Sequence, residues 1–367
     1  MSNNKAKFKE SYESASRFTR SVFDNFADGE LPTEIRLDLK ESYHFYLNNE
    51  DRQQLEAMGG IKRSLYSMWF LVKNLFMKLT PGRRVLVLIG TAIAFYGMSN
   101  ETDHVLIGFV TLLFVLGLEL KDKLMAHDQL EAGRAVQMAI MPHSIPDIPG
   151  WELWLYSVPA NEVGGDLIDH MKLSENTVAL TLGDIAGKGL PAALMAAKIQ
   201  ATVRAIALDY ADLPTRIDRL NAIILRDGLR EKFASLIHLE ISAINNQIHF
   251  VNAGHHPPIL VRATANNPVG KGGPAIGIAR KAAFSMETVE MNQDDILVMY
   301  SDGITEARNE DGEFYSDERL EKLLQHTHGM DAEALGARVL WSVDQFVRRA
   351  RPSDDISMIV IKRVSPA

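Results

Sequence analysis

Aspartates stand at four places where an apolar, strand-like run meets a loop: Asp166, Asp184, Asp302 and the pair Asp354 and Asp355. Two glycines precede Asp166 and one follows Asp302, so the backbone can approach a ligand closely there. A single aspartate beside a strand is most often a solvated cap, and Asp-Gly is a common turn signal. Four such sites together offer the carboxylate oxygens that a hard divalent cation binds, with water completing its octahedral shell. The sequence therefore predicts a divalent metal site built from these acids.

The segment Gly183–Gly189 places glycine and lysine ahead of a predicted helix, as a nucleotide phosphate loop does. That loop needs four residues between its first glycine and Gly-Lys, and then serine or threonine. Here three residues precede Gly187-Lys188, and Gly189 follows. Asp184 would also direct negative charge at the phosphates. The spacing disfavours a nucleotide-dependent kinase or cyclase, and we expect Lys188 to be a solvated loop lysine.

Three apolar runs are expected to be the strands that position these acids: Thr177–Leu182, Ile296–Tyr300 and Ile356–Ile361. A helix is expected to follow the second acidic site, because Pro191 stands where a first helical turn accepts proline. Each acid then lies at the point where a strand ends or begins.

Composition narrows the classes of function. The chain of 367 residues is 46% hydrophobic, which suffices for a sizeable core and more than one domain. A net charge of −8 without a dense basic run sets nucleic-acid binding aside. The absence of cysteine excludes disulfides, zinc-thiolate sites and thiol nucleophiles, so a metal must bind oxygen or imidazole. The polar start of the chain does not resemble a secretory signal peptide.

The first part of the chain, residues 1–83, is expected to be a helical region, and no motif in it indicates a chemical activity. Its last segment, from Ile61 to Lys78, has apolar residues at helical spacing interrupted by lysine and arginine. A helix lying on a membrane surface and an ordinary core-facing helix both fit this pattern.

Two uncharged apolar runs follow, Val85–Met98 and Val105–Leu118, separated by a polar turn that carries Glu101 and Asp103. Each run is shorter than the ~20 residues that cross a bilayer comfortably, so a buried hairpin in a soluble domain is the alternative. Lysines and arginines flank the pair on both outer sides. We therefore predict a transmembrane helical hairpin over residues 84–120 with both ends in the cytoplasm.

A polar helix is expected from Glu119 to Met141, with a linker or signalling helix assigned to residues 121–142. Leucine, valine and isoleucine form a thin apolar seam along it: Leu120, Leu124, Leu130, Val136 and Ile140. Such a seam suits pairing of two copies as a homodimer, and a plain spacer helix is the alternative. Residues 143–150 are rich in turn signals, so the catalytic domain is assigned to 143–367.

Several segments between Ala132 and Arg363 resemble one known family. They are, in chain order, Ala132–Gln137 with Met141-Pro142, Pro159–Asp166, Gly183–Gly189 with Pro191–Leu194, Asn252–Pro257, Tyr300–Glu306 and Asp354-Asp355. The family is the metal-dependent (PPM) protein phosphatases of the type 2C superfamily, in the bacterial branch that regulates sigma factors and sporulation. The resemblance implies an α/β layered fold, an αββα sandwich of two antiparallel sheets flanked by helices. Here a helical N-terminal region and a hydrophobic helical hairpin would precede it.

The resemblance also implies roles for the acids. Asp184 would bridge two Mn²⁺ or Mg²⁺ ions, with the backbone carbonyl of Ile185 as a further ligand. Asp302 and Asp354 would complete the first site, and Asp166 would hold the second ion directly or through water. Asp355 would either bind or orient its neighbour. Two ions roughly 4 Å apart lower the pKa of a shared water, so that hydroxide exists near neutral pH.

The implied activity is that of a serine/threonine protein phosphatase of a bacterium. Together with the predicted hairpin and its flanking charges, this puts the enzyme at the inner face of a bacterial membrane, with its catalytic domain in the cytoplasm. The implied substrate is a phosphoprotein such as an anti-sigma-factor antagonist. A catalytically silent scaffold of the same fold is the alternative, and loss of a metal acid would be its mark. His255 and His256 are expected to shape a turn. Recognition of the substrate phosphate is unassigned, because no arginine neighbours Asp166.

Overall fold

A computed structural model describes residue 55 and residues 60–100, 103–142, 144–210, 212–227 and 232–365. Much of the predicted region 1–83 and two residues of the turn with Glu101 therefore lie outside the described residues. Internal contacts divide the chain into two units, Met1–Lys123 and Leu124–Ala367. Each unit is described by itself.

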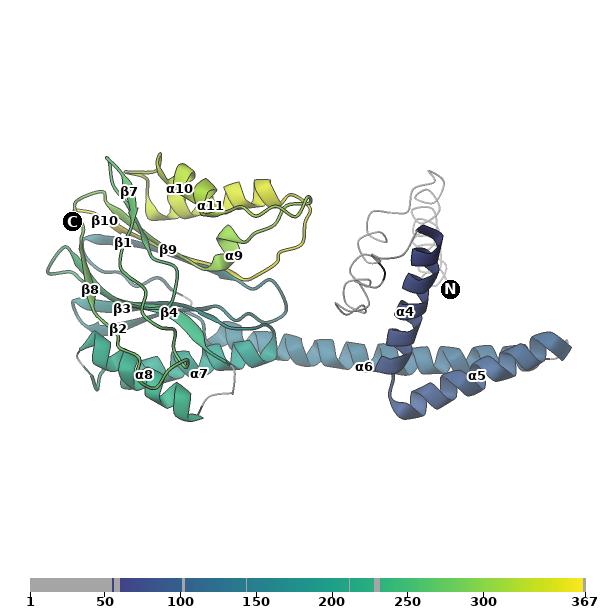
Figure 1. Ribbon diagram of the computed structural model, residues 1–367. Helices are drawn as coiled ribbons and strands as arrows, with labels where there is room; N and C mark the ends of the chain where they lie inside the picture. Colours follow the sequence, from purple (N-terminus) through teal and green to yellow (C-terminus); the bar gives the residue numbers. More distant parts are fainter. Residues whose placement is uncertain are drawn as a thin grey trace, which may run out of the picture. The chain divides into compact units, whose positions relative to one another are not determined.

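The second unit contains two five-stranded antiparallel sheets (Figure 1). The first, called the β9 sheet, has the order β1 (Trp151–Val158), β10 (Ile356–Arg363), β9 (Ile296–Tyr300), β6 (Ile259–Val261) and β7 (Asn266–Pro268). The second, called the β3 sheet, has the order β2 (Leu167–Ser174), β3 (Thr177–Ile185), β4 (Ala234–Ser242), β5 (Gln247–Ala253) and β8 (Glu287–Glu290). The predicted strands over 177–182, 296–300 and 356–361 are present in these sheets.

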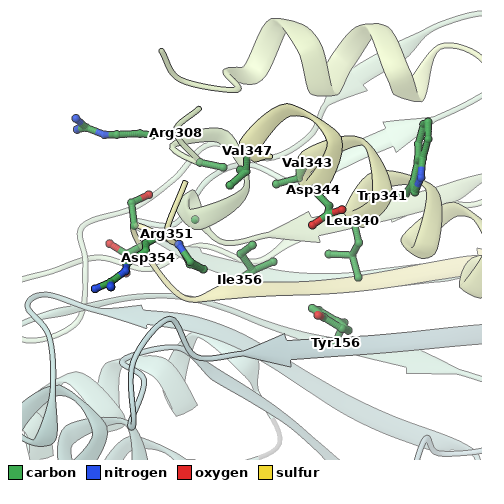
Figure 2. A pocket seen from close by; sticks show the side chains of 14 residues that line it. Tyr156, Arg308, Leu340, Trp341, Val343, Asp344, Val347, Arg351, Asp354 and Ile356 are labelled. Atoms are coloured by element: carbon green, nitrogen blue, oxygen red, sulfur yellow. The ribbon is translucent and has the colours of Figure 1, made fainter. Parts of the chain in front are cut away.

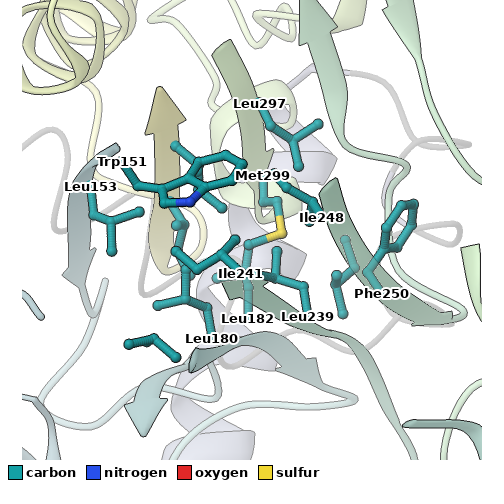
Figure 3. Packing of buried hydrophobic residues seen from close by; sticks show 14 of the residues in the cluster. Trp151, Leu153, Leu180, Leu182, Leu239, Ile241, Ile248, Phe250, Leu297 and Met299 are labelled. Atoms are coloured by element: carbon teal, nitrogen blue, oxygen red, sulfur yellow. The ribbon is translucent and has the colours of Figure 1, made fainter. Parts of the chain in front are cut away.

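The two sheets enclose the inner core, because alternate residues of each strand point between them. Leu180 lies opposite Leu239 and Leu182 opposite Ile237 across the β3–β4 pair, and all four are fully buried. Figure 3 shows these leucines facing Trp151, Leu297 and Met299 from the other sheet. This packing fixes the register of both sheets.

Helices cover both outer faces. Two further apolar clusters lie under them: α7 (Leu190–Ile206) and α8 (Leu213–Asp227) bury their apolar faces against the β3 sheet, while α10 (Asp317–Leu324) and α11 (Ala332–Val347) do so against the β9 sheet. A short helix, α9 (Asp302–Thr305), follows β9. The predicted αββα sandwich of two antiparallel sheets is confirmed.

A buried polar network joins α8 to the β3 sheet. Arg216, whose side chain is 2% exposed, donates to Glu240 at 2.7 Å and to the Tyr210 carbonyl oxygen at 2.9 Å. It also lies 3.0 Å from Nε2 of His238, while Nδ1 of that histidine lies 2.9 Å from the Thr181 hydroxyl. Burial lowers the pKa of His238 to about 3, so the ring is neutral at pH 7 and Nε2 accepts the guanidinium hydrogen.

Replacing Arg216 by alanine is expected to destabilise the catalytic unit by about 3–5 kcal/mol, because it leaves Glu240 and a carbonyl group without their buried donor. Arg219→Ala, on an exposed position of the same helix, is the matched control and should change stability by less than about 0.5 kcal/mol. Urea unfolding followed by tryptophan fluorescence measures both. Equal midpoints for the two variants would show that the network does not stabilise the fold.

The first unit contains α4 (Gly60–Lys78), α5 (Pro81–Asn100) and the start of α6 (His104–Ile140). α5 and α6 pack closely, since a Cβ on Gly108 would lie 2.6 Å from both the Ala94 nitrogen and the Gly90 carbonyl oxygen. At the other end, Arg83 binds Glu119 and Asp122 at 2.6 Å each. The two apolar runs therefore form a helical hairpin.

Helix α6 continues without interruption past Leu118, because no proline or polar turn separates the apolar run from the polar segment after it. The sequence predicted a boundary between the hairpin and the linker helix near residue 120. In the structure this boundary is only a change from apolar to polar residues within α6. Among the described helices, α6 alone is long and apolar enough to cross a membrane, and 11% of its most apolar stretch is buried. The first of the two predicted spans, in α5, does not meet the same criterion of length and composition.

Candidate active site

The predicted acids gather where strands of both sheets end. Asp302 follows β9 and Asp354 precedes β10, and the antiparallel pair of Tyr300 with Met358 brings these two ends to the same edge. In the other sheet, Leu167 lies opposite Gly183, which brings Asp166 close to Asp184 near the end of β3. Four loops far apart in the sequence therefore meet in one region.

The acids of the two sheets are close enough for their charges to affect one another's pKa values. Burial raises the pKa of Asp184 to about 7, with further contributions from the charges of Asp302, Asp354 and Asp355. Burial also raises the pKa of Asp302, and the charge of Asp354 raises it further. Without a cation, this cluster of like charges is unfavourable, as is expected of a site that binds one.

Asp166 is the most buried of the acids, with 4% of its surface exposed. Burial raises the pKa of its carboxyl well above the usual range, although hydroxyls of Ser357 and Ser301 act in the opposite direction. Its Oδ2 atom is buried without any hydrogen-bond partner. A buried carboxylate oxygen that lacks a donor is costly, so this atom is available for a ligand.

Asp355 has a different environment. One of its oxygens accepts a hydrogen bond from the Ala160 N–H at 2.8 Å, and the other accepts from the N–H groups of Gly165 at 2.5 Å and Asp166 at 3.3 Å. A Cβ on Gly303 would overlap the Asp355 carbonyl oxygen, so only glycine fits after Asp302. Asp355 therefore fixes the loop that carries Asp166.

Lys188 is exposed, as the sequence suggested, with 57% of its side-chain surface accessible, but it is also paired with an acid. Its ammonium group donates to Oδ2 of Asp354 at 2.7 Å and to the Ser353 carbonyl oxygen at 2.6 Å. The structure thus places a cation directly on one of the predicted metal acids. The sequence could not reveal this contact, because it joins residues from two distant loops.

The predicted residues fit divalent cations in donor type and charge, but their side chains are not arranged around a common point. Within the part of the chain that the structure describes, no group of three or more acidic or histidine side chains is placed to hold a metal ion. The buried, unpartnered Oδ2 of Asp166 and the ammonium group on Asp354 are both features that a bound cation would relieve. Ligation would require small carboxylate movements and release of Lys188.

The Ile185 carbonyl lies beside the loop of Asp166, since a Cβ on Gly165 would be 3.3 Å from that oxygen. This position suits its predicted role as a further ligand. The assignment of Asp166, Asp184, Ile185, Asp302 and Asp354 as ligands stays a prediction, as does the choice between binding and orienting for Asp355.

Gln137, near the end of α6, contacts the same loop. Its side-chain amide donates to the Gly164 carbonyl oxygen at 2.9 Å and accepts from the Gly164 N–H at 3.1 Å, and the residue is 9% exposed. Sequence reasoning assigned it no role. The only signal in the sequence was that Gln137 ends one of the segments that resemble the family. Its contact with Gly164, which is 27 residues further along the chain, depends on tertiary packing.

His255 is structural, as expected. Its Nδ1 accepts from the Ser235 hydroxyl at 2.7 Å, and its Nε2 lies 3.1 Å from the Tyr300 carbonyl oxygen. Burial lowers its pKa to about 4, so it stays neutral and ties β4 and β9 together. His256 stacks on the Tyr300 ring.

Comparison with known proteins identifies relatives of similar sequence. Residues 174–364 match the family model of stage II sporulation protein E (SpoIIE). Protein IcfG of Synechocystis is 26% identical over 266 residues, covering 64% of this chain and 41% of that protein. Phosphoserine phosphatase RsbU of Bacillus subtilis is 23% identical over 237 residues, covering 64% of this chain and 70% of that protein.

A solved structure, the SiaA-PP2C domain of Pseudomonas aeruginosa, superposes with a TM-score of 0.57 and 17% identity over 66% of this chain and 98% of that one. This likeness confirms the fold. The family model covers more than half of the chain, in the part that carries most of the acids. The protein therefore belongs to the stage II sporulation protein E (SpoIIE) family of type 2C phosphatase domains.

Proposed function

We propose that this protein is a metal-dependent serine/threonine protein phosphatase. The observation that carries the proposal is that Asp184 lies near Asp302 and Asp354 at one edge of the sandwich, where burial and then the charges of these neighbours raise its pKa. The match to a phosphoserine phosphatase of Bacillus subtilis supports the same activity. All the acids are retained, which disfavours the silent scaffold.

Bound Mn²⁺ or Mg²⁺ would supply a hydroxide near neutral pH and stabilise negative charge on the phosphoryl group. Asp166, Asp184, Asp302, Asp354 and the Ile185 carbonyl would hold the two ions. Asp355 and Gln137 would orient the loop that carries Asp166, through the backbone contacts described above. In this scheme the chain contributes no covalent nucleophile.

The full chain, purified in detergent, is expected to release phosphate from p-nitrophenyl phosphate and from phosphoserine-containing casein when Mn²⁺ is present. EDTA should abolish the release and excess Mn²⁺ should restore it, because the acids need cations to generate the nucleophile. A malachite-green assay measures the phosphate. Release that persists in EDTA would contradict the mechanism.

A phosphoprotein of a bacterial partner-switching pathway, such as an anti-sigma-factor antagonist, is the substrate class that the relationship to RsbU favours. Homodimerisation through α6 is supported by its seam, since Leu120, Leu124 and Val136 are 55%, 55% and 64% exposed. A second copy would cover these side chains.

We also infer a membrane tether that leaves the catalytic unit on the cytoplasmic side of a bacterial inner membrane. The length and composition of α6 and the close glycine-mediated packing of α5 against it support the inference. The chain is expected to sediment with membranes, to resist extraction by high salt, and to dissolve in mild detergent. Western blots of the fractions measure this, and recovery in the salt wash would contradict the tether.

A further inference from the structure

Lys188 joins two of the loops that carry the predicted metal acids. It belongs to the loop after β3, and its ammonium group donates to Asp354 and to the Ser353 carbonyl oxygen in the loop before β10. The side chain of Asp354 is 34% exposed, and that of Lys188 is more exposed still. This ion pair is therefore open to solvent, and a dissolved cation can reach it.

The charge of Lys188 also acts on a second predicted ligand. Burial and the charge of Asp354 raise the pKa of Asp302, whereas the charge of Lys188 acts in the opposite direction. Burial and the charges of neighbouring acids likewise raise the pKa of Asp184. A cluster of carboxylates is unfavourable without a cation. Lys188 therefore offsets part of the repulsion within the cluster.

The loop that carries Lys188 is firmly held on one side only. Before this lysine, both backbone groups of Ala186 make hydrogen bonds of 2.9 Å, one of them with the Lys232 ammonium group. After it, Gly189 adopts φ 72°, and a Cβ there would have no atom within 4 Å. Asp184 lies within β3 itself. The lysine side chain can therefore leave its acid partner while Asp184 stays in place.

Asp354 stands at an accessible edge of the acidic cluster. It forms part of the wall of a cavity of about 380 Å³ beside α11, and Figure 2 shows it at one end of that cavity. Asp166 differs, because it is 4% exposed and its Oδ2 atom is buried without a partner. An ion that arrives from solvent reaches Asp354 more readily than the buried acid, and at Asp354 it meets the lysine.

We propose that Lys188 is the internal counterion of the metal-free centre: it holds Asp354 until a divalent cation displaces it, and it thereby weakens the binding of that cation. A cation must break this ion pair before Asp354 can bind it, and the displaced ammonium group still repels the cation from the same loop. The inference rests on the metal centre of the proposed function. It goes further, because it makes occupancy of the centre depend on a competing side chain.

Mn²⁺ titration of the full chain in detergent, stripped of metal with EDTA and desalted, tests the competition. Electron paramagnetic resonance of the free ion measures binding without any enzymatic activity. Lys188→Met should lower the Kd of the tighter site about five- to tenfold, because the competing pair and one repelling charge are gone. Lys188→Arg retains the charge and should bind Mn²⁺ much as the wild type does.

Lys172→Met is the matched control. It removes the same charge at an exposed position of β2, near the end of the strand that lies away from the acids, where Lys172 is opposite Val178. Its Mn²⁺ affinity should equal that of the wild type, because a distant exposed charge is screened by salt.

Melting of the metal-free protein tests the counterion by a second route. Lys188→Met should lower the melting temperature by about 2–4 °C, as loss of a partly exposed ion pair does. The same substitution in an Asp354→Asn background should change it little, because the partner is already neutral; this double-mutant cycle isolates the pair. At saturating Mn²⁺, Lys188→Met should melt no lower than the wild type, whose lysine is then displaced.

The possible results separate this inference from the proposed function. Equal Mn²⁺ affinities for Lys188→Met and Lys172→Met would overturn the counterion and leave the metal centre intact. Unchanged affinity with a raised KM for p-nitrophenyl phosphate would overturn it too, and would assign Lys188 to the substrate phosphate. Wild-type protein that binds Mn²⁺ but releases no phosphate would contradict the phosphatase alone. Mn²⁺ binding that Asp184→Asn leaves unchanged would contradict both.

Discussion

Asp184→Asn is expected to lower kcat/KM for p-nitrophenyl phosphate by at least about a thousandfold, since cations supply several kcal/mol of charge stabilisation and each 1.36 kcal/mol is a factor of ten. Asparagine keeps the size of the side chain but removes the charge at the centre of the acidic cluster. Steady-state assays across Mn²⁺ concentrations measure the loss, which added metal should not restore.

The same substitution should raise the melting temperature of the metal-free protein. Burial and three neighbouring carboxylates disfavour the ionised form of Asp184 in the folded state, so a neutral amide relieves repulsion. Asp169→Asn is the matched control, because Asp169 is also a buried aspartate but pairs with Arg204 at 2.6 Å. That variant should lose stability and keep activity. An active Asp184→Asn enzyme would refute the assigned role.

Gln137→Ala is expected to reduce activity about 10–100-fold and to raise the Mn²⁺ concentration needed for half-maximal activity, as loss of an outer partner of a metal site does. The glutamine amide makes both hydrogen bonds to Gly164, two residues before Asp166. Without them the loop loses its two buried hydrogen bonds to α6, and Asp166 is held less firmly. Manganese titrations of activity measure the shift.

Gln137→Glu should fail as well, because a carboxylate can accept from the Gly164 N–H but cannot donate to its carbonyl oxygen. Met138→Ala, at the next position of α6 and 44% exposed, is the control and should retain wild-type metal dependence. The contact also offers a physical route by which movement of α6 could regulate the enzyme, since the helix and the acid loop share it. Wild-type manganese dependence in Gln137→Ala would exclude this coupling.

Local patterns allowed much of the fold and the acid set to be predicted. Strand-like runs such as Ile296–Tyr300 have the boundaries that the structure shows, because apolar residues with flanking turn signals define them. The acids beside them were recognisable for the same reason. The sequence did not separate Asp354 from Asp355, since only tertiary contacts show that Asp355 binds backbone N–H groups.

Features that depend on distant contacts were not predictable. Lys188 and Asp354 meet across 166 positions, because the loop after β3 and the loop before β10 come together at one edge of the sandwich. The length of α6 was also missed, because a change from apolar to polar composition does not end a helix. The contact of Lys188 with Asp354 is set by packing rather than by local propensity, whereas the continuity of α6 reflects the absence of a helix-breaking residue.

Diffraction from crystals of the full chain grown with Mn²⁺, recorded at the manganese absorption edge, tests the central claim most directly. We predict two anomalous peaks between Asp184 and the acids at 166, 302 and 354, with the Lys188 ammonium displaced from Asp354. Manganese bound elsewhere, or absent from Asp184 at saturating concentration, would contradict the assignment of this acidic edge as a two-metal centre.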